Sequence, residues 1–166
     1  MPREPAARLI AYSSLLVVSA FIALAAWALS SPLGSSPDDD FHLNSAWCGL
    51  GEREGLCEAT EEDGLKLVPA VTDSSAICFA FNPERSAGCQ ELGVAGGSLE
   101  LRPTDRGNFV NQYPQVYYAF AGIFASKDVA AAAMMMRFFN VVVFLGVTAM
   151  VLVSLPARFR GAILWP

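Results

Sequence analysis

The sequence predicts a mainly α membrane protein in which two transmembrane helices flank a large outer loop. Of its 166 residues, 54% are hydrophobic and 16% are charged, against roughly a quarter charged in an ordinary soluble domain. Long apolar runs lie near both ends, and residues 30–112 between them carry fourteen Asp or Glu against five Lys or Arg. This acidic loop argues against a nucleic-acid partner, because phosphate binding needs a basic face.

The first apolar run, residues 9–29, predicts a transmembrane helix. It follows a basic leader, residues 1–8, and contains twenty-one uncharged residues. At about 1.5 Å per residue it is roughly 31 Å long, which matches the hydrocarbon core of a bilayer. A cleavable signal peptide is the alternative, with Ala26-Trp27-Ala28 as a small-x-small cleavage site. The run exceeds the roughly 7–15 apolar residues of signal peptides, which favours an anchor.

The outer loop, residues 30–112, opens with prolines, serines and the acidic run Asp38-Asp39-Asp40. Residues 41–50 then place apolar side chains at helical spacing, and an Asp of the run could cap that helix. We expect a short amphipathic helix on the membrane surface, with Trp47 at the headgroup level. Further along, residues 65–71 and 76–81 are typical of strands and predict a small β element.

The four cysteines all lie in this loop, which indicates an oxidising compartment outside the membrane. Two disulfides allow three connectivities, and the local one, Cys48 with Cys57 and Cys78 with Cys89, is favoured because it closes short loops. A structural zinc site is the alternative, but these spacings lack the close ligand pairs of zinc sites.

After the loop, residues 113–126 form an apolar, aromatic stretch that would span only about 21 Å as a helix. It predicts a juxtamembrane or re-entrant helix, because a crossing needs about 30 Å. Residues 129–155 predict the second transmembrane helix. With basic residues in the leader and in the end segment 156–166, both termini are expected in the cytoplasm and the loop outside.

Arg137 is the one charge in the second helix, about two turns from its outer end. A charged residue at this depth usually has a partner or a role. Two interpretations stay open: its side chain snorkels to the outer surface, or it contacts an anion such as a phosphate.

Three short motifs, in this order, carry a resemblance to a known family. They are Ser36-Pro37-Asp38-Asp39-Asp40-Phe41-His42, Tyr113-Pro114-Gln115-Val116-Tyr117-Tyr118 and Met136-Arg137-Phe138. Together they resemble the N-terminal part of a bacterial family of multi-spanning membrane proteins, domain of unknown function 2142. That family is in turn similar to the GT-C class of polyprenyl-phosphate-dependent glycosyltransferases.

The resemblance implies a role for the acidic run. In GT-C enzymes an acidic residue just after the first helix acts as catalytic base or helps to hold a divalent metal near a lipid-phosphate sugar donor. Carried over, Asp38 and Asp39 match the acidic pair and the metal ligands, if a metal is bound, although the second position is often Glu. His42, Tyr117 and Arg137 match positions expected to contact the substrate or its phosphate. The alternative is that the run is a solvated helix cap.

Two helices cannot enclose a polyprenyl-phosphate site, so we expect an incomplete GT-C-like fold that needs the missing helices or a partner membrane protein. Two functions follow. The first is the N-terminal fragment of a glycosyltransferase-like enzyme of cell-envelope polysaccharide assembly, inactive alone. The second is a non-catalytic two-pass membrane protein whose disulfide-bonded outer loop binds a partner. The first would place the chain among enzymes, and the second would not.

Overall fold

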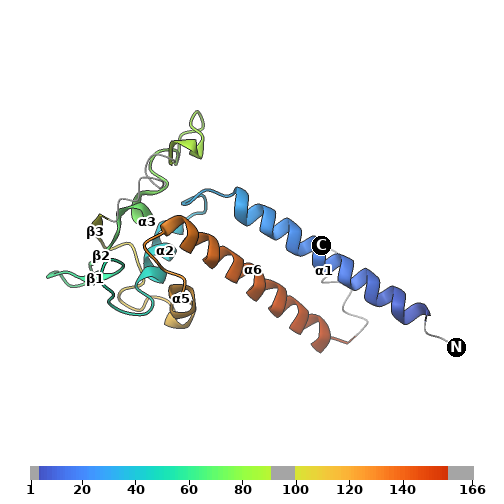
Figure 1. Ribbon diagram of the computed structural model, residues 1–166. Coiled ribbons are helices and arrows are strands. Elements are labelled where there is room, and N and C mark those ends of the chain that lie inside the picture. Colours follow the sequence, from blue (N-terminus) through green and yellow to red (C-terminus); the bar gives the residue numbers. More distant parts are fainter. Residues whose placement is uncertain (1–3, 91–99, 157–166) are drawn as a thin grey trace. The chain divides into compact units, whose positions relative to one another are not determined.

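The computed structural model describes residues 4–90 and 100–156, which divide into two compact units (Figure 1). The helical unit consists of residues 1–30 and 137–166, and the loop unit of Ser31–Met136. Helix α1 (Glu4–Ser30) belongs to the helical unit, and α6 (Val129–Ser154) runs from the loop unit into it. The other helices and strands that the structure describes lie in the loop unit.

Within residues 4–90 and 100–156, two helices have the length and composition to cross a membrane, as predicted. The candidate spans are Tyr12–Ser30 within α1 and the whole of α6. Large apolar side chains along both helices are exposed, including Leu15 and Val153. A core helix of a soluble protein would bury such side chains, whereas a helix facing lipid exposes them.

The first two turns of α6 pack in the core of the loop unit. Val129, Ala132, Ala133 and Met136 are all buried there. The rest of the helix, from Arg137 on, belongs to the helical unit. From that residue to Ser154 it is about 27 Å long at roughly 1.5 Å per residue, close to the thickness of a hydrocarbon core.

The loop unit combines short helices with a three-stranded antiparallel sheet. Among its described residues, the helices are α2 (Asp39–Trp47), α3 (Ala70–Ser74), η1 (Ala87–Gln90) and α5 (Gln115–Gly122). The strands β1 (Glu58–Ala59), β2 (Lys66–Pro69) and β3 (Leu101–Thr104) are ordered β1-β2-β3. Leu67 of β2 pairs with Glu58 and with Pro103, a proline that the edge position of β3 tolerates.

Helices α2 and α5 lie against each other, and two glycines permit the close approach. A Cβ at Gly49 would overlap the backbone carbonyl of Tyr118, and one at Gly122 would lie 2.7 Å from the carbonyl oxygen of Ala46. The fully buried side chain of Trp47 fills the core beside this contact. Since α5 is only eight residues long, it spans about 12 Å.

Two sequence expectations for the loop unit are wrong. Trp47 is completely buried in the core, so it does not lie at the headgroup level. Residues 76–81 form turns, although residues 66–69 within the other expected strand do form β2. The partners of β2 are β1 and β3, whose short sequences carry no apolar alternation that could have marked them.

Both disulfides form, with the local connectivity. Cys48 pairs with Cys57 across a sequence separation of 9, and Cys78 with Cys89 across 11. The first joins the end of α2 to the turn before β1 and is nearly buried, since Cys57 is 1% exposed. The second, between Cys78 and Cys89, closes a loop in the segment that follows α3. The prediction of two disulfides is confirmed.

Candidate functional site

The acidic run lies at the N-terminus of α2, where carboxylates are favoured by the helix dipole. Asp38 precedes the helix in the left-handed conformation (φ 59°), which directs Asp39 and Asp40 into its first turn. Asp38 makes no side-chain capping hydrogen bond, contrary to the expected cap. Instead, Asp39 Oδ2 accepts a hydrogen bond of 2.8 Å from the backbone N–H of Gly34 and so fixes the loop that leaves α1.

Arg106 joins two of these carboxylates across 66 or more residues of sequence. Its Nε and Nη2 donate to the two oxygens of Asp40 at 2.8 and 2.9 Å, and Nη2 also lies 3.2 Å from Asp38 Oδ1. These hydrogen bonds hold the pKa of Asp40 below its usual value and raise that of Arg106. The Asp38 carboxylate remains 67% exposed, which makes it the more accessible partner of Arg106.

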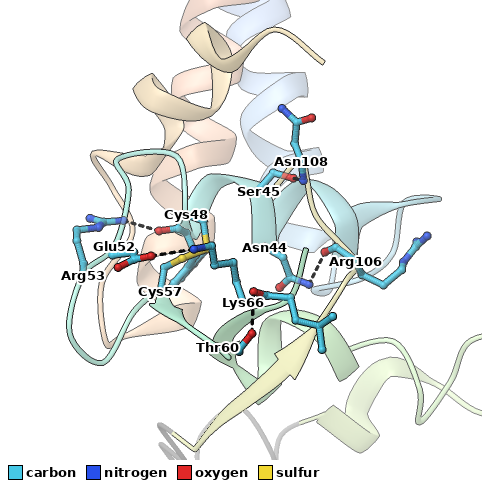
Figure 2. The surroundings of a disulfide bond; sticks show 12 residues. Asn44, Ser45, Cys48, Glu52, Arg53, Cys57, Thr60, Lys66, Arg106 and Asn108 are labelled. Atoms are coloured by element: carbon cyan, nitrogen blue, oxygen red, sulfur yellow. Dashed lines mark hydrogen bonds and ion pairs between the residues drawn. A yellow bond between two sulfur atoms is a disulfide. The ribbon is translucent and has the colours of Figure 1, made fainter. Parts of the chain in front are cut away.

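A buried polar network positions the turn that carries Arg106. The side-chain amide of Asn44, which is fully buried, donates to the backbone oxygen of Arg106 at 2.9 Å (Figure 2). It also donates to Asp73 Oδ1 at 3.1 Å. Thr104 donates to the same Asp73 oxygen and accepts from the Arg106 N–H. The guanidinium is therefore held at the start of α2 by contacts to the middle of that helix.

Aromatic rings surround His42, one turn further along α2. Its Nδ1 lies 3.0 Å from the hydroxyl oxygen of Tyr118, and the two rings stack with centroids 6.0 Å apart. Tyr113 contacts His42, and Tyr117 meets Tyr118 edge to face at 5.4 Å. His42, Tyr113 and Tyr117 are exposed, so the cluster presents an aromatic surface beside the acidic run.

Burial raises the pKa of Tyr118, and a hydrogen bond with Ser45 partly offsets that rise. The hydroxyl is therefore protonated at neutral pH. When it donates to His42 Nδ1, the imidazole carries its own proton on Nε2. That tautomer leaves an N–H donor on the other edge of the ring.

Arg137 contacts the end of α1 within the helical unit. Its Nη1 donates to the backbone oxygen of Ala28 at 3.2 Å. Carbonyls in the last turn of a helix lack intrahelical partners and carry partial negative charge, so a guanidinium there is stabilising. The sequence left two roles open for Arg137, snorkelling to the outer surface and binding an anion, and this contact with α1 is a third. Anion binding by Arg137 stays a prediction.

The structure thus brings together Asp38, Asp39, His42 and Tyr117 on or beside α2. Sequence reasoning missed Arg106, which has no motif of its own, and Tyr118, which differs from Tyr117 only in being buried. Within residues 4–90 and 100–156, no group of three or more His, Cys, Asp or Glu side chains could hold a metal ion. A divalent metal at Asp38 and Asp39 would need further ligands from outside the described residues.

One comparison with known proteins gives a match. The family model described as "Predicted membrane protein (DUF2142)" matches residues 21–165, which is most of the chain. No curated protein matches the chain, and no solved structure does.

Proposed function

The chain belongs to this family of predicted membrane proteins, domain of unknown function 2142, and on that premise we propose that it is the N-terminal part of a bacterial GT-C-like glycosyltransferase. Its donor would be a polyprenyl-phosphate-linked sugar, and its product a cell-envelope polysaccharide. The observation that carries the proposal is the exposed Asp38 carboxylate held beside the Arg106 guanidinium at the start of α2. The loop unit would lie outside the membrane and both termini in the cytoplasm.

These residues are suited to glycosyl transfer from a lipid phosphate. A hydroxyl oxygen of the acceptor sugar attacks the anomeric carbon, its proton passes to the Asp38 carboxylate, and the bond to the phosphate oxygen breaks. Arg106 supports the departing phosphate, because its Nη1 donates no hydrogen bond within the described part of the chain. His42 and Tyr117 offer a donor and an aromatic surface to the substrate.

The test is sugar transfer in native membranes that contain the protein with all its partners. With a radiolabelled polyprenyl-phosphate-linked hexose as donor, Asp38→Asn should reduce transfer at least a hundredfold, the scale of losing a general base. Asp63→Asn, in the exposed turn between β1 and β2, is the matched control. Equal transfer by both variants would remove Asp38 from the chemistry.

A second candidate function is binding of a partner protein by a non-catalytic loop unit. This function is favoured by the segment after α3, where the Cys78–Cys89 disulfide closes a loop. Two large apolar side chains of this segment, Ile77 and Phe81, are exposed. Phe81 is fully exposed with a positive φ of 60°, an unusual conformation for a bulky residue. On this second function Phe81→Ser would abolish co-purification of such a partner, whereas the first function predicts that Phe81→Ser changes neither assembly nor sugar transfer.

A further inference from the structure

A pocket with both polar and apolar lining lies at the C-terminal end of α2, whereas the acidic run lies at its N-terminal end. It has a volume of about 270 Å³ and is formed within the loop unit by α2, the turn that follows it, β2 and the loop before α5. The side chains that matter for its chemistry are those of Ser45, Lys66, Asn108, Phe109, Asn111 and Gln115. None of them takes part in the proposed transfer.

Hydrogen bonds hold the pocket wall in place. The backbone N–H of Asn108 donates to Ser45 Oγ at 2.8 Å (Figure 2). The Asn108 side chain accepts from the backbone N–H of Tyr113 and donates to its carbonyl oxygen. Gln115 Nε2 donates to the backbone carbonyl oxygen of Asn108 and to Asn111 Oδ1. The Cys48–Cys57 disulfide links this same C-terminal end of α2 to the turn before β1, and Cys48 itself lines the pocket. A wall built in this way loses little entropy when a ligand binds.

Several polar groups of the wall remain available to a ligand. Within the described residues, Gln115 Oε1 and Asn111 Nδ2 have no hydrogen-bond partner, which leaves one acceptor and one amide donor. The Lys66 ammonium uses one of its three donors on Glu52, at 2.8 Å. Phe109 adds a half-buried aromatic side chain.

We propose that this pocket binds one neutral sugar ring. A pyranose offers hydroxyls that both donate and accept, which the amides and the ammonium match, and CH groups that pack on an aromatic ring. An anionic ligand fits less well, because the only cation in the pocket is already paired with Glu52. The volume falls below the roughly 300–1,000 Å³ of pockets for drug-sized ligands, so one ring fits rather than an oligosaccharide.

This inference deepens the proposed function, because it supplies a sugar subsite in the same unit, and it rests on that function for the identity of the sugar as acceptor. Binding itself needs neither a lipid donor nor Asp38. The binding experiment and the transfer experiment can therefore fail separately.

The test is saturation-transfer NMR on the full chain in lipid nanodiscs. The probes are the methyl glycosides of glucose, galactose and N-acetylglucosamine, with glucose 6-phosphate as the anionic comparison. At least one neutral glycoside should give a saturable signal. Lys66→Met and Asn111→Gly should each weaken its binding about threefold to tenfold, the effect of one lost hydrogen bond. Glycine suits position 111 because Asn111 has a positive φ of 58°.

Arg102→Met is the matched control, because Arg102 is an exposed cation on β3 that does not line the pocket. It should bind like the unchanged protein, and circular dichroism should show that all three variants fold. No saturable signal from any neutral glycoside would overturn the proposal. Equal binding by the pocket variants and the control would also overturn it. Tighter binding of glucose 6-phosphate than of every neutral glycoside would do the same.

Discussion

Replacing Arg106 by Met tests whether the acidic run is held by one cation. The variant loses the two hydrogen bonds to Asp40 and the ion pair with Asp38. The Arg106 side chain is 48% exposed and that of Asp40 is 29% exposed, so solvent screens much of the attraction. We expect the free energy of unfolding to fall by about 1 kcal/mol, the upper end for exposed pairs, because the Asp40 contact is bidentate.

The pH dependence supplies an independent measure of the same pair. The folded-state pKa of Asp40 is lowered, so the stability it contributes is fully present above its unfolded value of about 3.9. That stability is lost as the pH falls through the lower, folded pKa. The difference between the unchanged protein and Arg106→Met should therefore be constant near neutrality and shrink below about pH 4.

The assay is urea unfolding in detergent, followed by the fluorescence of the buried Trp47. Arg102→Met is the control, since its ion pair with Glu100 is 3.6 Å long and more than half exposed on both sides. A double-mutant cycle with Asp40→Asn should give a coupling energy of roughly 0.5–1 kcal/mol. A loss no larger than that of the control, or a coupling energy of zero, would refute the reasoning.

Three other predictions concern the loop unit. Trp47→Ala should lower its free energy of unfolding by about 3–5 kcal/mol because the side chain is fully buried, whereas the exposed Trp27→Ala should change little; equal urea midpoints, followed by circular dichroism, would contradict this. Gly49→Ala should cost about 1–3 kcal/mol, because a Cβ overlaps the Tyr118 carbonyl, and the urea midpoint of Gly146→Ala, where nothing lies within 4 Å, should not fall. The four cysteines should resist thiol labelling until a reductant is added, and labelling of the unreduced protein would show that the disulfides are absent.

The prediction of strands at residues 65–71 and 76–81 is only partly correct, and the reason is that a local sequence pattern does not show which strands will pair. Residues 66–69 form a strand because a paired strand lies on each side. The run at residues 76–81 is as apolar, but it follows α3 directly and its backbone hydrogen bonds are made within turns. Strand formation depends on partners that are distant in sequence, so two similar runs can have different structures.

For Trp47, the local sequence likewise does not show whether the side chain lies at the membrane surface or in the protein core. At helical spacing beside an apolar run, a tryptophan is typical of the bilayer interface. Here α5 and the start of α6 provide a protein surface against which it is buried. Nothing near Trp47 in the sequence distinguishes these two environments, because both bury an apolar ring.

The sequence by itself determined the two apolar helices and the acidic loop between them, and it favoured the local pairing of the cysteines among three connectivities. Each of these depends on composition or on residues close together in the chain. Only the tertiary structure decided which groups accompany the acidic run. Arg106 meets Asp40 across 66 residues, and Tyr118 meets His42 across 76. These contacts arise from the packing of α2 against α5 and from the Asn44 network, which no local pattern records.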